Sequence, residues 1–241
     1  MIDIKIITAY PDMFPGSLSH SIIGKALEEK KWSLEIINLH DFGIGERKSI
    51  DDEPYGGGPG MILRPDIVEK ALLFCQKNQP ITSLKSKLIY LTPSGIPLKQ
   101  SNLAEFIKFD QLIILCGRFE GVDSRAIEIL NFEEYSIGDY VLIGGEIASQ
   151  VLVEGCIRLI PGVLGEPESL LEESFSNNFL EYPQYTRPKV WIDTQRIKHE
   201  VPEILLSGHH ENIKQWRINE SIKKTKKNRP DLLEVKKKEQ E

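Results

Sequence analysis

The chain has 241 residues, of which 40% are hydrophobic and 27% charged, with a mean hydropathy of −0.25. These values are typical of one large or two small globular domains, and no apolar run approaches the ~20 residues that cross a bilayer. The start reads as a first strand and not as a signal peptide. Three widely spaced cysteines, Cys75, Cys116 and Cys156, argue against a disulfide framework and a zinc site, and predict a cytoplasmic protein.

Charge is distributed unevenly along the chain. The net charge is −6, but residues 187–229 hold 11 basic against 5 acidic side chains, whereas residues 1–186 hold 16 against 27. A basic segment on an acidic body is a hint of an anionic partner. A solvated basic helix that binds nothing is the alternative, and charge alone does not decide between them.

Strand-like and helix-like patterns alternate through the first two thirds of the chain. The predicted strands are residues 4–10, 33–39, 87–93 and 111–117, and the predicted helices are residues 14–31, 64–78, 97–109, 122–130 and 146–159. This alternation predicts an α/β domain with a mainly parallel sheet. Ligands of such sheets bind outside the carboxyl ends of the strands, so residues 91–95, 116–121 and 136–145 are the loops expected to carry function.

Residues 135–146, YSIGDYVLIGGE, place glycines on both sides of an apolar run. Glycine weakens a strand, because it loses backbone entropy and packs no side chain. Two interpretations fit: a sharply bent core strand, or a backbone shaped to lie against a ligand. In residues 116–123, CGRFEGVD, Arg118 and Glu120 follow a buried strand between two glycines, which favours ligand contact over a surface ion pair. Residues 51–61 form a glycine loop that fits a surface loop or a ligand lid equally well.

The character of the chain changes after residue 160. Residues 161–178 contain prolines and clustered acids and predict a linker or mobile loop. Beyond them, Ile213, Trp216 and Ile222 recur near one helical face, with Ser207 near the N-cap, which predicts a small helical domain. Trp216 is more typical of a core position than of a base-stacking platform. Only residues 234–241 have the composition of a disordered tail.

Six segments occur together in the order found in one family. They are PYGGGPGM (54–61), CGRFEGVD (116–123), SIGDYVLIGGE (136–146), RLIPGVLG (158–165), YPQYTRP (182–188) and LLSGHHENIKQWR (205–217). In this respect the chain resembles the bacterial tRNA (guanine-N1)-methyltransferases of the SPOUT class, from its first strand to about residue 230. One segment is moderate evidence, but six in order are specific.

The resemblance implies a fold, a partner and a reaction. A SPOUT-type parallel sheet with a deep C-terminal trefoil knot, a rare exception to the rule against threaded chains, is expected over residues 1–160. Residues 161–178 are then an interdomain linker and residues 179–241 a small all-helical tRNA-binding domain. The protein is expected to be a homodimer whose active site spans the interface. S-adenosylmethionine is the implied methyl donor and N1 of guanosine 37 of tRNA the acceptor.

The resemblance also implies which residues form the sites. The donor site is expected at Tyr90, Leu91, Pro93, Gly117, Glu120, Ile137, Gly138, Asp139, Tyr140, Val141, Leu142, Gly144 and Gly145. Contacts to tRNA are expected from Asp52, Arg187, His209 and Arg217. Magnesium is compatible with the family, but no metal site is predicted because no isolated ligand cluster demands one.

The chemistry requires a base and a cation. Guanine N1 carries a proton that a general base must remove, and the negative charge that develops on O6 calls for a fixed donor. Arg158 matches the family's arginine. The family usually has aspartate directly before a Ser-Phe pair, whereas this chain has Glu173, which reaches further by one methylene, and Glu172 beside it competes for the role.

Two other functions remain open. One is a SPOUT-fold RNA-binding protein that has lost catalysis. The presence of Arg158 and of a carboxylate at Glu173 argues against it. The other is a nucleotide-dependent α/β enzyme such as an oxidoreductase. The absence of the motif G-x-G-x-x-G after the first strand argues against it. Residues 191–200 are longer than the family usually carries before the Val-Pro pair, and predict a loop extension whose basic residues add backbone contacts.

Overall fold

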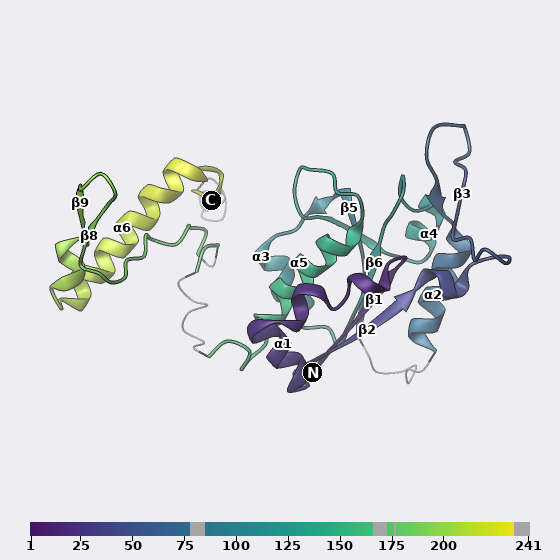
Figure 1. The fold of residues 1–241 in the computed structure, drawn as a ribbon, viewed down its shortest axis with the longest axis horizontal. Coiled ribbons are helices and arrows are strands. Elements are labelled where there is room, and N and C mark those ends of the chain that lie inside the picture. Colours follow the sequence, from purple (N-terminus) through teal and green to yellow (C-terminus); the bar gives the residue numbers. More distant parts are fainter. Residues whose placement is uncertain (78–84, 166–172, 176, 234–241) are drawn as a thin grey trace, which may run out of the picture. The chain divides into compact units, whose positions relative to one another are not determined.

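The computed structural model describes residues 1–77, 85–165, 173–175 and 177–233 (Figure 1). The chain forms two compact units, Met1–Gly165 and Glu166–Glu241. The predicted linker at residues 161–178 spans this boundary and stays a prediction. The tail at residues 234–241 and the competing acid Glu172 lie outside the described residues.

The first unit is built on a five-stranded sheet with strand order β2-β1-β6-β5-β7. Its strands are β1 (Ile2–Thr8), β2 (Trp32–Asn38), β5 (Ser86–Pro97), β6 (Gln111–Cys116) and β7 (Glu133–Ser136). All of its pairings are parallel. A separate antiparallel pair, β3 (Asp51–Asp52) and β4 (Ile62–Leu63), closes the glycine loop. The α/β class and the parallel sheet are confirmed, whereas the trefoil knot stays a prediction.

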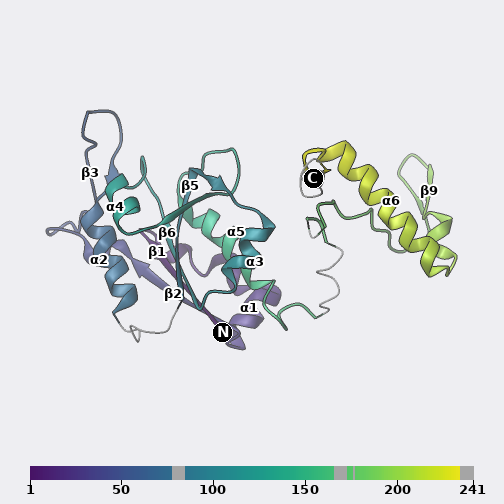
Figure 2. The same ribbon diagram turned by 180° about the vertical axis from the view of Figure 1, so that it is seen from behind.

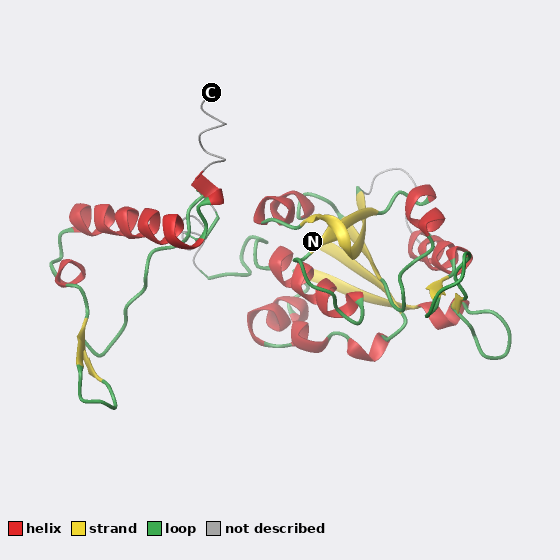
Figure 3. Ribbon diagram, turned by 90° about the horizontal axis from the view of Figure 1, so that it is seen from above, coloured by secondary structure: helices red, strands yellow, loops and turns green. Residues whose placement is uncertain are grey.

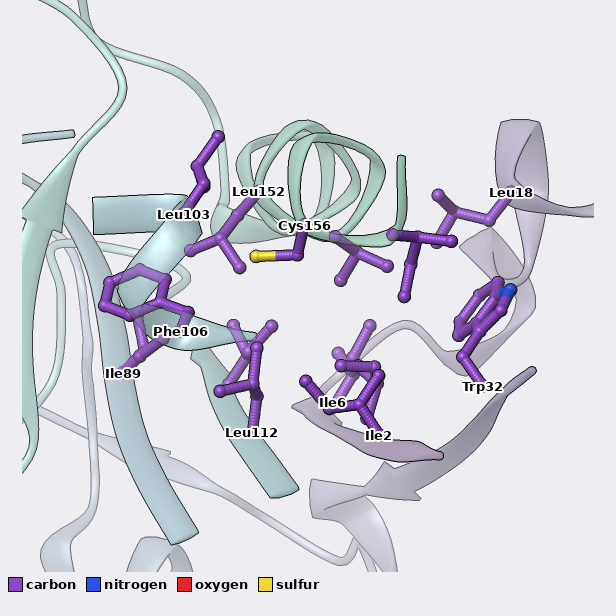
Figure 4. Close-up of a cluster of buried hydrophobic side chains, with 14 of the residues drawn as sticks. Ile2, Ile6, Leu18, Trp32, Ile89, Leu103, Phe106, Leu112, Leu152 and Cys156 are labelled. Atoms are coloured by element: carbon purple, nitrogen blue, oxygen red, sulfur yellow. The ribbon is translucent and has the colours of Figure 1, made fainter. Parts of the chain in front are cut away.

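Helices cover both faces of the sheet, as Figures 2 and 3 show from two further directions. They are α1 (Ser21–Glu28), α2 (Pro65–Gln76), α3 (Gln100–Phe106), α4 (Ser124–Ile129) and α5 (Gly145–Ile157). Residues of α1, α3 and α5 share one buried cluster with the sheet, and residues of α2 and α4 share the other. Figure 4 shows the first cluster, where Leu152 and Cys156 of α5 face Ile6 and Leu112 of the central strands. This packing holds the N-terminus of α5 next to the end of β6.

The helix predicted over residues 14–31 is wrong in its first half. The structure has two 3-10 turns, η1 (Pro11–Met13) and η2 (Gly16–Ser19), and α1 begins only at Ser21. Pro15 and Gly16 cause the break, since proline disfavours a helical conformation in the residue before it and Gly16 has a left-handed φ of +55°. Periodicity alone did not show this break, because the apolar spacing continues across it.

The second unit is described by itself and is not all helical, so that prediction is wrong. It contains α6 (His210–Asn228), the 3-10 turn η5 (Glu203–Leu206) and an antiparallel hairpin of β8 (Val190–Ile192) and β9 (Lys198–Glu200). The expected loop extension is therefore a β-hairpin. The β-branched and aromatic run at residues 190–192 favours a strand, and Asp193 organises the turn that follows.

Polar contacts tie the chain before the hairpin to α6. The buried Thr225 hydroxyl accepts a hydrogen bond of 2.9 Å from the backbone N–H of Leu180, and Ser221 Oγ donates one of 2.8 Å to the Leu180 carbonyl. Trp216 is half-buried, with its ring centroid 6.3 Å from that of Tyr185, in agreement with a packing role. Among the described residues, no helix has the length and apolar character needed to span a membrane.

Candidate functional site

A cavity of about 240 Å³ opens at the carboxyl ends of β5, β6 and β7. The three loops singled out from the sequence meet there. Twelve of the thirteen predicted donor-site residues line it: Tyr90, Leu91, Pro93, Gly117, Glu120, Ile137, Gly138, Tyr140, Val141, Leu142, Gly144 and Gly145. Asp139 is exposed in the same loop and does not line the cavity.

Other residues of the lining were not predicted as donor-site residues. They are Thr92, Arg118, Phe119, Gly121, Tyr135, Ser136, Ile143 and Ala148. Most are chain neighbours of predicted residues and could have been found by taking each loop whole. Ala148 could not, because it reaches the cavity from the second turn of α5.

Strand β5 does not end at Pro93 as predicted but bulges around the cavity. It pairs with β7 at Leu91 and again at Ile96, and both of these residues lie opposite Tyr135. The residues between them are left out of the ladder, which turns their backbone toward the cavity. A Cβ atom on Gly95 would lie 2.5 Å from the backbone of Tyr135, so only glycine allows β5 to resume its pairing with β7 after the bulge.

The loop after β7 explains the glycine-flanked apolar run. Strand β7 stops at Ser136, whose hydroxyl donates to the Gly138 carbonyl at 3.0 Å and accepts from the Gly138 N–H at 3.2 Å. Gly138 has a φ of +154°, and Val141 and Ile143 are 84% and 90% exposed. The bent core strand is therefore wrong. The run is an open loop along the cavity, and its contact with a ligand stays a prediction.

The floor of the cavity is formed by close backbone contacts. A Cβ atom on Gly117 would lie 2.9 Å from the Tyr90 ring, and one on Gly145 would lie 2.8 Å from the Cys116 Cα. Burial raises the pKa of the Tyr90 phenol, which therefore stays protonated at neutral pH. Burial also raises the pKa of the Cys116 thiol, so this cysteine is no nucleophile.

An ion pair lies behind the cavity wall. Arg118 Nε is 2.9 Å from Glu146 Oε2, with side chains 14% and 1% exposed; the N–H direction does not meet hydrogen-bond geometry. Thr8 Oγ1 donates to Glu146 Oε1 at 2.8 Å. The Arg118 guanidinium carbon also lies 4.2 Å from the Tyr10 ring centroid, within cation–π range. The contacts of Thr8 and Tyr10 with this ion pair could not be predicted from the sequence, because more than a hundred residues separate them from Arg118.

The two predicted catalytic residues belong to different units. Arg158 is half-buried at the C-cap of α5, and Glu173 is half-buried in the second unit. Each engages neighbours within the structure. Their action on one guanine base stays a prediction.

The predicted tRNA contacts are mostly exposed. Asp52 forms an ion pair of 2.9 Å with Arg64, Arg187 is exposed, and the exposed His209 occupies the N-cap of α6. Ser207, predicted near this N-cap, accepts the His209 N–H through its hydroxyl at 3.2 Å. Arg217 is half-buried, with its guanidinium carbon 4.7 Å from the Tyr182 ring centroid.

His, Cys, Asp and Glu side chains are scattered over the described ranges. Within them, no group of three or more His, Cys, Asp or Glu side chains is placed to hold a metal ion. The role of magnesium therefore stays untested.

Comparison with known proteins gives concordant matches over nearly the whole chain. A family model described as tRNA (Guanine-1)-methyltransferase TrmD matches residues 2–235. The tRNA (guanine-N(1)-)-methyltransferase of Ehrlichia canis strain Jake is 46% identical over 236 residues, which cover 97% of this chain and 96% of that protein. The protein of the same name from Cereibacter sphaeroides strain KD131 / KCTC 12085 is 49% identical over 228 residues, covering 95% and 90%. That from the Wolbachia of Brugia malayi is 48% identical, covering 97% of both chains.

Proposed function

The chain belongs to the tRNA (guanine-1)-methyltransferase TrmD family, and we propose that it transfers a methyl group from S-adenosylmethionine to N1 of guanosine 37 of tRNA, on the 3′ side of the anticodon. One structural observation supports the proposal above the others. The cavity at the carboxyl ends of β5, β6 and β7 is bounded by the three loops that carry the family's motifs. This is the place where parallel α/β sheets bind their ligands.

The residues that line the cavity support the assignment of the donor by their chemistry. Leu91, Pro93 and Ile137 offer apolar walls for a flat base, and the glycines leave backbone N–H and C=O groups accessible. The carboxylate of Glu120 suits an ammonium group. When bound, S-adenosylmethionine supplies an electrophilic sulfonium methyl group, so the residues around it need only orient the reactants and exclude water.

The remaining chemistry falls to side chains that act on guanine. We assign removal of the N1 proton to the carboxylate of Glu173, with Glu172 as the alternative. The guanidinium of Arg158 is assigned to the negative charge that develops on O6. Both residue types suit these roles at neutral pH, since a carboxylate accepts a proton and arginine stays charged.

We further propose that the protein is a homodimer with an active site at the interface and a knotted first unit. Ile147 and Val151 lie one turn apart on α5 and are 50% and 49% exposed, and Ile143 just before the helix is 90% exposed. Contiguous apolar surface of this kind marks an association site. Because Ile143 also lines the cavity, a second copy packed on this surface would lie next to the bound donor.

A cytoplasmic location belongs to the same proposal. Cys75, Cys116 and Cys156 are all free and buried. Free thiols suit a reducing compartment.

Methyl transfer to tRNA transcripts with G or A at position 37, followed by mapping of the methylated base, tests the function. We expect methylation at N1 of G37 and none of the A37 transcript. Equal methylation of both transcripts would contradict the assignment of the acceptor. No transfer together with intact tRNA binding would favour an RNA-binding protein without catalysis. Calorimetry with S-adenosylmethionine and NAD separates both from a nicotinamide-dependent enzyme.

A further inference from the structure

The β8–β9 hairpin presents an exposed aromatic pair. Trp191 and His199 lie directly opposite each other in its register. Their ring centroids are 5.1 Å apart, with an interplanar angle of 31°. Trp191 is 59% exposed, although it is one of only three tryptophans in the chain. Tryptophan is enriched at interfaces, because its ring offers a large apolar face to a partner.

The turn of the hairpin is well ordered by one carboxylate. Asp193 Oδ1 accepts hydrogen bonds from the backbone N–H groups of Gln195 and Ile197 at 2.9 and 2.8 Å. Asp193 Oδ2 lies 2.9 Å from His199 Nε2. The carboxylate therefore holds both the turn and the imidazole ring beside Trp191. A partner would meet a preformed surface, which lowers the entropic cost of binding.

The rest of the hairpin is exposed as well, apart from the half-buried Asp193. Val190, Ile192 and Ile197 are 37%, 56% and 52% exposed. An isolated two-stranded hairpin is marginally stable in water. The absence of a cover within the described part of the second unit thus points to a binding partner.

Charge identifies the chemistry of that partner. The basic residues Lys189, Arg196 and Lys198 are all exposed on or beside the hairpin. Alternation along the strand places Lys189 on the same face as Trp191. The nearby acids are Asp193, whose carboxylate is held by the turn and by His199 Nε2, and Glu200. Cations around a flat exposed ring match unpaired RNA, whose bases stack and whose phosphates need positive charge.

We infer that the β8–β9 hairpin is an RNA-contact surface on which Trp191 stacks against an unpaired base of the tRNA, while Lys189 and Arg196 contact its phosphates. The inference rests on the proposed function for the identity of the RNA. It adds a base-stacking site outside the cavity of the first unit. A protein partner, including a second copy of this chain, is the competing occupant.

Tryptophan fluorescence can follow this surface directly. Trp32 is buried at 1% exposure and Trp216 is half-buried, so in Trp216→Phe the accessible emission comes from Trp191. We expect acrylamide to quench Trp191 readily in the free protein and poorly at saturating tRNA. Strong protection of Trp191 from quenching in the free protein would mean that protein covers the hairpin. Equal quenching with and without tRNA would mean that RNA does not cover it. Either result overturns the inference.

Binding measurements with variants give an independent test. Stacking on an aromatic ring contributes directly to the affinity for a base, so Trp191→Ala should weaken tRNA binding about tenfold, whereas Trp191→Phe should retain most of the affinity. The rate at saturating tRNA should not change, because the hairpin acts in binding and not in the reaction. Ile192→Ala is the matched control on the opposite face and should bind tRNA as the wild type does.

The variants also separate the inference from the proposed function. If the wild type methylates G37 and Trp191→Ala binds tRNA with unchanged affinity, the inference is wrong while the proposed function stands. If the wild type neither binds nor methylates tRNA, the proposed function fails first. Sedimentation of Trp191→Ala tests the competing occupant, because a loss of self-association would mean that the hairpin contacts a second copy of the chain.

Discussion

The N–H group of Gly145 donates a hydrogen bond of 2.9 Å to the carbonyl oxygen of Gly117. This bond joins the first residue of α5 to the loop after β6, two of the three segments that bound the cavity. Neither residue has a side chain in the way, so the two backbones meet directly. Whatever binds in the cavity depends on this spacing.

A valine at position 145 should abolish S-adenosylmethionine binding while the α/β unit stays folded. Its Cβ atom would lie 2.8 Å from the Cys116 Cα and 3.0 Å from the Gly117 backbone nitrogen. Both are main-chain atoms, so no side-chain rotation relieves the contact. Calorimetry measures the affinity and circular dichroism the fold. Gly165→Val is the control, because among the described residues, its chain neighbours apart, no atom lies within 4 Å of the Cβ position there. Unchanged donor affinity in a folded Gly145→Val protein would refute the placement of the site.

Gly144 and Gly145 follow each other at the start of α5. In the structure Gly144 has an extended backbone, with a φ of −168°. Its Cβ atom would meet Arg118 Nε at 2.3 Å, and that of Gly145 would meet the backbone. Contact with the protein itself, and not backbone strain, therefore selects glycine at both positions.

Glu146→Gln should destabilise the first unit and weaken donor binding. The substitution leaves the Arg118 guanidinium, only 14% exposed, without its counter-charge, and breaking a buried ion pair on one side costs ~3–5 kcal/mol. Because Arg118 lines the cavity, its displacement changes the wall as well. Thermal unfolding and calorimetry with S-adenosylmethionine measure the two effects.

A double-mutant cycle provides the control for this ion pair. Arg118→Met alone leaves the carboxylate unpaired, whereas Glu146→Gln with Arg118→Met removes both charges. The double variant should therefore be more stable than the sum of the single effects predicts. Additive losses in the unfolding free energy would show that the two side chains do not stabilise each other.

The affinity for tRNA should fall steeply with salt, whereas the affinity for S-adenosylmethionine should barely change. Residues 187–229 hold 11 basic against 5 acidic side chains, and phosphate contacts release counterions on binding. Titrations of both ligands between low and physiological salt measure the two slopes. Equal slopes would remove the assignment of tRNA binding to this segment.

Local sequence patterns predicted four of the five strands of the sheet and the cavity loops, because each is set by residues close together in the chain, whereas β7 was not predicted as a strand. The buried apolar runs of β5 and β6 and the glycines at 117 and 145 are of this kind. Contacts between distant residues were not predicted. The bond from Thr8 to Glu146 spans 138 residues, and no spacing rule connects two such positions.

The β8–β9 hairpin escaped prediction for a different reason. Its strands have three residues each, too short for alternation to be recognised against the background of a loop. The polar residues of the turn also read as a surface extension. Only Asp193, whose side chain accepts two backbone N–H groups, gives the turn its form, and a single aspartate is a common residue in loops.

Glu173→Gln should bind S-adenosylmethionine normally but lose methyl transfer by ~10²-fold or more, the usual range for a general base. The amide is nearly isosteric with the acid, so the half-buried position can keep its packing. Glu173→Asp restores the residue usual in the family and should stay far more active than Glu173→Gln. It should be slower than the wild type if the backbone has shifted to suit the longer side chain. Single-turnover methyl transfer measures all three proteins.

Glu172→Gln is the control for the assignment of the base, and it should have a small effect because neighbouring residues in a chain seldom point the same way. An inactive Glu172→Gln beside an active Glu173→Gln would move the base by one position. If both single variants stay active, neither acid alone removes the N1 proton. The base would then be a water molecule or one of the acids of the glycine loop, Asp51 and Asp52. Of these two, Asp52 is already paired with Arg64 at 2.9 Å, so Asp51→Asn would be the next variant to measure.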